Sequence, residues 1–296
     1  MKYFSEVVLL IKTNSIIDFE TWIKWYLYAI CFDHIVVYNN DSFVDLKSIC
    51  NKYNIEYHEV HGWCHQASLY NEHLRNTKAQ WIAFLDADEF LYISEQYDYK
   101  VNNYIKQISS KFNCNKLAFN MVNMFSYDTI AVRDAANSFI TNNIYYNPNV
   151  PNSAYHKLHS TGNYLLKNII NTDTKWTFFD ESDISKYYIT YVHNPHVLNA
   201  DGSNSCVPAY FENGNSTIYI EYKQNKSCEG CFVAHYQFRS EEEWKTKCML
   251  GRVSKRNNDL NTPDKLALYN EVYKYKNRFL KCTLVRDRYF AIKDII

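Results

Sequence analysis

Glycine is scarce in this chain, with only six residues among 296. A dinucleotide-binding turn needs glycines in G-x-G-x-x-G spacing and a P-loop needs G-x-x-x-x-G-K-S/T, because the backbone must approach phosphates closely. Neither pattern occurs in the sequence. The composition therefore argues against a dinucleotide oxidoreductase and against a P-loop NTPase.

Long apolar runs are also missing, since none reaches the 18 or so residues of a membrane-spanning helix. The opening segment MKYFSEVVLLIK has one short apolar run and no small-residue cleavage site, so we expect a strand there rather than a signal peptide. Nine cysteines, odd in number and scattered, fit a reducing compartment better than a disulfide framework. These features predict a soluble, cytoplasmic protein.

Neither sign of charge is in excess, because 32 basic residues face 32 acidic ones. This balance argues against nucleic acid as a partner. The distribution is uneven, however, and residues 239–296 hold 14 Lys/Arg against 8 Asp/Glu. We expect this basic segment to meet phosphates, a partner or an anionic membrane surface, so peripheral membrane contact is one alternative. The oligomeric state is left open.

What the sequence does contain is a regular alternation of strand-length apolar runs and helix-period segments. Strands are predicted at 6–11, 34–38, 55–60, 81–85, 116–125 and 187–192, and helices at 16–32, 44–53, 67–78, 241–256 and 262–289. Strands that alternate with helices of this length pair in parallel through right-handed crossovers. The pattern predicts an α/β protein with a Rossmann-like, mostly parallel central sheet and C-terminal helices. The irregular stretch at 130–160 is predicted to be a functional loop or lid.

Two aspartates stand at the carboxyl end of the predicted strand 81–85, in the run WIAFLDADEFLYI. Asp86 and Asp88 are two residues apart, so on an extended chain both carboxylates point the same way. Open α/β sheets place their ligand sites at this edge. Paired carboxylates there suit Mg²⁺ or Mn²⁺ holding a diphosphate, because such ions take the rest of their ligands from water and phosphate oxygens. An acidic strand-to-loop turn is the plainer alternative.

Several segments together resemble glycosyltransferases of the GT-A type, close to family 92 and its family 2 neighbours. They are VVLLIK, FETWIKWYL with DHIVVYNNDS, QASLYNEHLRNTKAQWIAFLDADEF and HYQFRSEEEWKTKCMLGR. The chain departs from the group's usual Lys-Asn-Glu after the first strand and Asp-Asn after the second, where it has Lys12-Thr13-Asn14 and Asn39-Asn40. The resemblance implies a nucleotide-sugar-binding fold and a metal-dependent transfer of a hexose.

The resemblance also assigns roles to individual residues. It implies that Asp88 ligates the metal and that Asp86 ligates it too or contacts the ribose. Residues implied to bind the nucleotide sugar, a UDP-sugar first, are Lys12, Thr13, Asn14, Asn39, Gln66, Asn71 and Asp86, with Lys167 and Arg239 at the leaving diphosphate. The third metal ligand is predicted to be His235, with His193 and His196 as alternatives.

An inverting transfer also needs a carboxylate that takes the proton of the acceptor hydroxyl. Asp180, Glu181 and Asp183 are the candidates in the later part of the chain, and Glu89 lies next to the aspartate pair. The acceptor is expected to be a glycan or a lipid- or protein-linked sugar.

Residues 1–238 are expected to form the catalytic domain, with a nucleotide-binding half at 1–93 and an acceptor half at 94–238, and residues 239–296 to pack on it as a helical segment. Two alternatives stay open: a noncatalytic module that binds nucleotide sugars, and a haloacid-dehalogenase-type phosphatase that uses the first aspartate as nucleophile.

Overall fold

The structure is a computed structural model, and it describes a defined set of residues. These are residues 3–62, 66–130, 132, 139–146, 166–174, 176, 207–211, 214–221, 228, 230–250, 273–274, 276–278 and 280–293.

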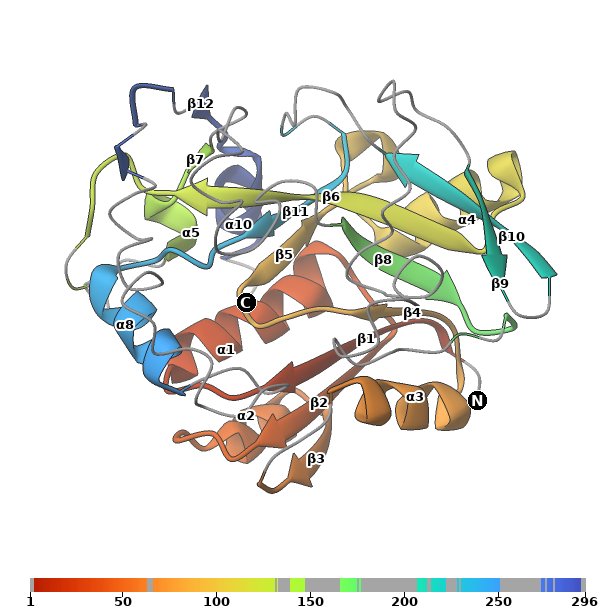
Figure 1. The fold of residues 1–296 in the computed structure, drawn as a ribbon, viewed down its shortest axis with the longest axis horizontal. Coiled ribbons are helices and arrows are strands. Elements are labelled where there is room, and N and C mark those ends of the chain that lie inside the picture. The colour runs from red at the N-terminus through yellow and green to blue at the C-terminus, as the bar shows by residue number, and fades with distance from the viewer. Residues whose placement is uncertain are drawn as a thin grey trace.

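The first four strands form the parallel part of the central sheet, in the order β3-β2-β1-β4. They are β1 (Tyr3–Ile11), β2 (His34–Asn40), β3 (Glu56–Val60) and β4 (Ala79–Phe84), joined by α1 (Ile16–Lys24), α2 (Leu46–Lys52) and α3 (Gln66–Asn76). The chain runs outward from β1 to β3 and returns to the other side of β1, so the order reverses between β1 and β4 (Figure 1). The predicted α/β fold with a mostly parallel central sheet is confirmed.

Beyond β4 the sheet continues through β8 to β6, with both pairings antiparallel. The strands of this half are β5 (Glu89–Tyr92), β6 (Lys116–Phe125), β8 (Leu166–Asn171), β9 (Val207–Phe211), β10 (Gly214–Glu221) and β11 (Phe232–His235). Two antiparallel steps make β6 run in the same direction as β4, and β11 pairs with β6 in parallel. The carboxyl ends of β1, β2, β4, β6 and β11 therefore lie along one edge of the sheet.

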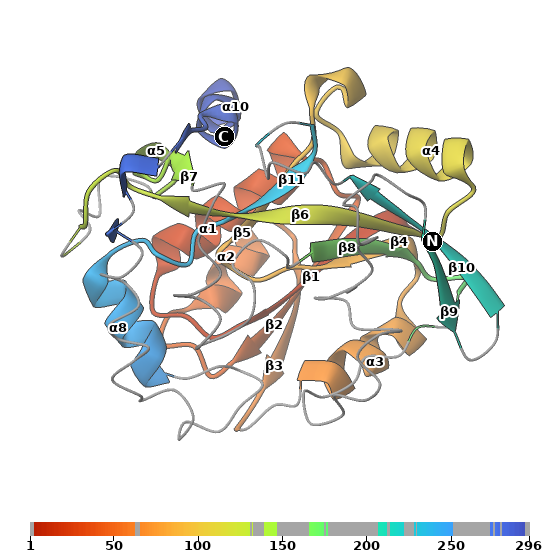
Figure 2. The ribbon, with the colours of Figure 1, turned by 45° about the horizontal axis from the view of Figure 1, so that its top comes forward.

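Side chains of β1 alternate between two apolar clusters on opposite faces of the sheet. Val7 and Leu9 belong to the larger cluster, which includes buried residues of α1, α2 and α4 (Val101–Phe112), whereas Val8 and Leu10 pack with Tyr70 of α3. Figures 1 and 2 show α3 across the sheet from α1 and α2. Helices cover both faces, as a parallel sheet requires.

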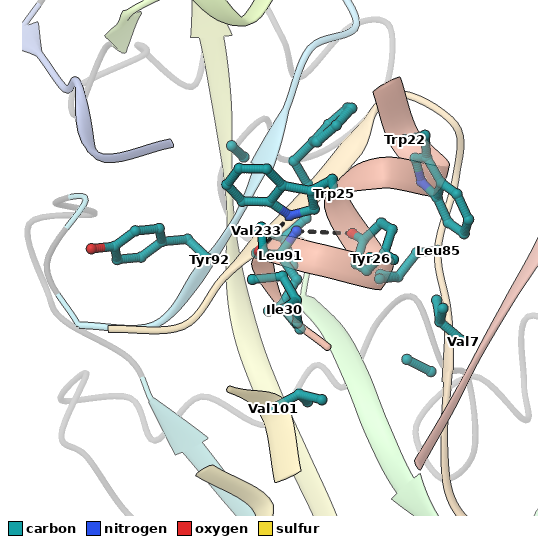
Figure 3. Close-up of a cluster of buried hydrophobic side chains, with 14 of the residues drawn as sticks. Val7, Trp22, Trp25, Tyr26, Ile30, Leu85, Leu91, Tyr92, Val101 and Val233 are labelled. Carbon is teal, nitrogen blue, oxygen red and sulfur yellow. Dashed lines mark hydrogen bonds between the residues drawn. The ribbon is translucent and has the colours of Figure 1, made fainter. Parts of the chain in front are cut away.

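The predicted single helix at 16–32 is two elements in the structure. α1 ends at Lys24 and is followed by one π-helical turn, η1 (Trp25–Ala29). This turn directs two aromatic residues at β5: Trp25 Nε1 donates to the Leu91 carbonyl at 2.9 Å, and the Tyr26 hydroxyl accepts from the Leu91 N–H at 2.9 Å (Figure 3). The helix that precedes η1 is thereby fixed against the strand that follows Asp88.

The C-terminal region differs from the predicted pair of long helices. α8 (Glu241–Leu250) begins where the sequence predicts, after Ser240, and residues 251–272 lie outside the described part. The helix predicted at 262–289 is wrong as one continuous helix: its described part holds a 3₁₀ turn η5 (Lys276–Arg278) and strand β12 (Leu280–Lys281), and it is helical again from the start of α10 (Leu284–Lys293). The reason is that β12 pairs with β7 (Tyr145–Tyr146), next to the short helix α5 (Phe139–Asn142), and this pairing interrupts the helix.

A buried polar network lies on β1, at Glu6. The Glu6 side chain is 2% exposed and accepts hydrogen bonds from His34 Nδ1 at 2.6 Å, His73 Nε2 at 2.7 Å and Thr77 Oγ1 at 2.7 Å. Burial acts to raise the pKa of Glu6, but the bonds from His34, His73 and Thr77 outweigh it and lower the pKa to about 2. A buried carboxylate held this way is ionised in the folded state.

We expect Glu6→Gln to remove part of the pH dependence of stability. The folded pKa lies below the unfolded value of about 4.5, so the stabilisation is complete above pH 4.5 and is lost as pH falls toward 2. The shift corresponds to about 3 kcal/mol of unfolding free energy. Urea titrations between pH 2.5 and 7 measure the difference between wild type and variant. Glu56→Gln, at an exposed partner of His34, is the control, and a difference that does not shrink toward low pH contradicts this account.

Candidate functional site

The two aspartates lie in the turn between β4 and β5, at the carboxyl edge of the sheet. β4 is the neighbour of β1, so this turn borders the place where the strand order reverses. Ligands of open α/β sheets bind in the crevice outside the strand ends at such a reversal. The segment after β1 carries no glycine, so polar side chains rather than a glycine-rich loop line this edge.

Backbone hydrogen bonds fix the aspartate turn on both sides. Glu89 N donates to the Asp86 carbonyl at 3.0 Å, which closes the turn, and Tyr236 N donates to the Asp88 carbonyl at 2.7 Å. The indole of Trp22 on α1 donates to the same Asp86 carbonyl at 3.1 Å. The main chain at both aspartates is therefore fixed by these contacts.

The Asp86 carboxylate is in contact with a buried ion pair. Lys167 Nζ lies 3.1 Å from Asp86 Oδ2 and 2.9 Å from Glu89 Oε2, and Glu89 Oε2 also accepts from the Asp86 N–H. Lys167 is 3% exposed and Glu89 is 1% exposed. Burial raises the pKa of Glu89, Lys167 opposes this, and the charges of Asp86 and Asp88 add to it. Burial tends to lower the pKa of Lys167, but its two carboxylate partners raise it overall.

These positions correct two sequence-based roles. Glu89 lies beneath the turn and is closed off from solvent, so it does not fit a base that must reach an acceptor hydroxyl. Lys167 is the counter-ion of Asp86 and Glu89 and holds the turn from below, rather than presenting its ammonium group at the surface for a diphosphate.

Asp88 faces His235, which is the last residue of β11. His235 Nε2 lies 3.6 Å from Asp88 Oδ2, and the other ring nitrogen, Nδ1, lies 2.9 Å from Asn123 Oδ1 on β6. An amide oxygen only accepts, so Nδ1 donates its proton to Asn123 and the ring is turned with Nε2 toward Asp88. Gln237 Nε2 donates to the same Asn123 oxygen at 3.1 Å and helps to hold this orientation.

The charge on Asp88 is compensated from several sides. Lys247 Nζ on α8 lies 2.5 Å from Asp88 Oδ2. Burial acts to raise the pKa of Asp88, but Lys247, His235 and Arg239 outweigh it and hold the pKa well below its usual range. Arg239 itself is bound to Asp18 in the first turn of α1 and lies over the Phe139 ring, so it braces the site instead of facing a diphosphate.

Lys12, Thr13, Asn14 and Asn39, which are predicted to contact the nucleotide, lie along the same edge, at the ends of the neighbouring strands β1 and β2. Thr13 N donates to Ser42 Oγ at 3.1 Å, which joins the ends of β1 and β2, while Lys12 and Asn14 flank it. Asn39 bridges Ser42 and Tyr57, as its Oδ1 accepts from Ser42 N and its Nδ2 donates to the Tyr57 hydroxyl. Gln66 and Asn71 lie on α3, and Gln66 Nε2 donates to the Tyr70 hydroxyl.

Asp88 and His235 could supply two of the ligands of one hard divalent cation, but not a complete set. Among the residues that the structure describes, no group of three or more His, Cys, Asp or Glu side chains is placed to hold an ion. Asp88 and His235 do form a pair: adjacent ligands of an octahedral ion at 2.1 Å lie about 3 Å apart, and their separation of 3.6 Å is close to this. The anchoring of Nδ1 by Asn123, with Nε2 turned toward a carboxylate, is typical of a metal-binding histidine. Mg²⁺ and Mn²⁺ complete such partial sites with water and phosphate oxygens.

The remaining predicted site residues, Asp180, Glu181, Asp183, His193 and His196, lie outside the described residues, as does the strand predicted at 187–192. Sequence reasoning missed Lys247 and Asn123. Both lie in elements that the sequence predicts correctly, the helix after Ser240 and strand 116–125. Asn123 belongs to no motif, and Lys247 lies in the segment HYQFRSEEEWKTKCMLGR, whose resemblance assigns it no role. Among the described helices, none has the length and apolar character that crossing a bilayer requires.

His235→Ala should weaken Mn²⁺ binding about 10- to 100-fold if this imidazole is a ligand. Calorimetric titration of Mn²⁺ in the presence of UDP measures the change, and His58→Ala, at a largely exposed histidine on β3, is the control. An unchanged titration in His235→Ala would move the third ligand to His193 or His196.

Comparisons with known proteins leave the family unassigned. No family model matches the chain, so the resemblance to family 92 stays a prediction, and no curated protein matches either. Among solved structures, residues 1–349 of S. aureus TarS align at 13% identity over 91% of this chain and 71% of that one, with a TM-score of 0.39. A longer TarS structure aligns at 12% identity over 94% of this chain and 43% of that one, with a TM-score of 0.40.

Glucosyl-3-phosphoglycerate synthase from Mycobacterium tuberculosis, in complex with Mn²⁺, UDP and phosphoglyceric acid, aligns at 9% identity over 58% of this chain and 56% of that one, with a TM-score of 0.31. TM-scores of this size do not establish a shared activity.

Proposed function

We propose that this protein is a glycosyltransferase that binds a nucleotide-sugar donor, a UDP-sugar first, through a divalent cation at Asp88. The observation that carries the proposal is the pair of Asp88 Oδ2 and the oriented Nε2 of His235, at the carboxyl edge beside the reversal of strand order. The absence of a glycine-rich phosphate loop after β1 supports it, because the diphosphate then needs another positive partner.

Each residue has a part in donor binding under this proposal. Asp88 and His235 hold the cation, Mn²⁺ or Mg²⁺, and the buried Lys167 keeps Asp86 in place toward the ribose or the same cation. Thr13 and Asn39, at the ends of β1 and β2, border the base. The cation supplies positive charge where negative charge develops on the leaving diphosphate.

The acceptor side rests on residues in the later part of the chain. An inverting transfer needs a base within hydrogen-bond reach of the acceptor hydroxyl. With Glu89 buried, the proposed bases are Asp180, Glu181 and Asp183. The proposed acceptor is a glycan or a lipid- or protein-linked sugar. A peripheral membrane contact of the C-terminal segment is part of the same proposal. Lys276 of that segment pairs with Asp128, whereas Lys281 is exposed.

A screen of nucleotide sugars with and without Mn²⁺ tests the proposal. We expect slow metal-dependent hydrolysis of one UDP-sugar, and transfer once a suitable acceptor is present. Binding of a nucleotide sugar without any turnover would favour a noncatalytic module. Hydrolysis of simple phosphomonoesters, with no response to nucleotide sugars, would favour the phosphatase and contradict the proposal.

A further inference from the structure

The ammonium group of Lys247 is hydrogen-bonded to the Asp88 oxygen that a cation would need as its ligand. This group lies 2.5 Å from Asp88 Oδ2, the same oxygen that lies 3.6 Å from His235 Nε2. Lys247 is 48% exposed, whereas Asp88 is 14% exposed. One long, solvated side chain therefore covers a carboxylate that is otherwise nearly closed off.

The helix that carries Lys247 is anchored independently of this contact. Ser240 Oγ accepts from the Glu243 N–H at 3.2 Å and donates to the Glu243 carboxylate at 2.7 Å, which caps the start of α8. Trp244 and Cys248, one turn apart, are buried, and the Trp244 ring packs on Phe238. α8 also lies beside the N-terminal end of α1 in both views (Figures 1 and 2). The Lys247 side chain can therefore leave Asp88 without any shift of the helix.

We infer that Lys247 is a built-in competitor of the divalent cation, which holds the cation's position on Asp88 until a diphosphate arrives. This inference rests on the proposed function, because it concerns the same cation and the same donor. A cation that binds alone must displace the ammonium group and leave it without a counter-ion. A diphosphate changes this balance, since its oxygens complete the cation's shell and also offer the displaced Lys247 a new negative partner.

The consequence is an order of binding. Mn²⁺ binds weakly to the free protein and more tightly once UDP is present, and by linkage UDP binds more tightly once Mn²⁺ is present. Removal of the competing ammonium group should therefore raise the affinity for Mn²⁺ in the absence of nucleotide. Displacing an ion pair between a nearly buried carboxylate and a half-exposed ammonium group costs about 1 to 2 kcal/mol, which corresponds to about 5- to 30-fold in affinity.

The test compares Lys247→Met with Lys245→Met in the full-length protein. Lys245 is on the same helix and pairs with Glu241 at 2.7 Å, so its replacement changes the net charge equally but leaves Asp88 untouched. Free Mn²⁺ is measured by electron paramagnetic resonance during titration of each protein, without UDP and with saturating UDP. Thermal unfolding of each variant confirms that it is folded.

We expect Lys247→Met to bind Mn²⁺ about 5- to 30-fold more tightly than wild type without UDP, and Lys245→Met to match wild type. The gain that UDP brings should be smaller in Lys247→Met than in wild type. Equal or weaker Mn²⁺ binding in Lys247→Met overturns the inference. If Lys247→Met gives that result while UDP still binds with Mn²⁺ in wild type, the inference about Lys247 is wrong and the proposed function still stands. If UDP fails to bind to any of the proteins, both the inference and the proposed function are wrong.

Discussion

Asp88→Asn should lower turnover of the nucleotide sugar by at least about 100-fold at saturating Mn²⁺, the loss expected when the carboxylate that holds the cation at the leaving diphosphate is neutralised. The amide keeps the shape of the side chain but not its charge. The turn itself should survive, because the Asp88 carbonyl accepts from Tyr236 N and the Asp86 carbonyl accepts from Glu89 N. Initial rates over a range of Mn²⁺ concentrations measure the effect.

A matched control for Asp88→Asn is Asp173→Asn. Asp173 is exposed and follows β8, at the end of the sheet opposite the turn, so the same chemical change there should leave turnover within about twofold of wild type. Wild-type turnover in Asp88→Asn would show that this carboxylate only supports the turn.

Lys167→Met should destabilise the fold by about 3 to 5 kcal/mol, because it leaves the buried Glu89 carboxylate without its ammonium partner. The effect should depend on pH. In the wild type the folded pKa of Glu89 is already raised to about 8, and without Lys167 it rises further, so the variant loses more unfolding free energy than the wild type as pH rises above about 8. Urea unfolding of both proteins at pH 5.5 and pH 9 measures both the size and the sign.

The double variant Lys167→Met/Glu89→Gln separates charge from shape. It removes the unpaired charge along with its partner, so it should recover at least half of the lost stability. Lys24→Met, at a surface pair with Glu20, is the control and should change stability by less than about 1 kcal/mol. A double variant as unstable as Lys167→Met would mean that packing of the lysine stem, and not charge, holds the turn.

The sequence was most informative where local pattern and tertiary structure agree. The strand predicted at 116–125 matches β6 at both ends, and the βα alternation gave the parallel half of the sheet, because buried strands and amphipathic helices have different apolar periods. The pattern was least informative where a short strand stands alone. β12 has only two residues and exists through its pairing with β7, which no local period reveals.

The site shows the same limit. Asp86 and Asp88 were recognised because two charges interrupt an apolar run, a feature that is visible in one dimension. The roles of Lys167 and Lys247 depend on which carboxylate each one meets, 81 and 159 residues away along the chain. The topology of the sheet determines which charged side chains meet across such long separations in the sequence. The sequence alone therefore placed Lys167 at the diphosphate and missed Lys247.

Calorimetric titration of UDP into the protein, with Mn²⁺ and then with a chelator, tests the central claim most directly. If the diphosphate is held through a cation at Asp88 and His235, UDP binds at least about 10-fold more tightly with Mn²⁺, and Asp88→Asn abolishes that difference. Equal UDP affinity with Mn²⁺ and with chelator, or a Mn²⁺ effect that persists in Asp88→Asn, would contradict it.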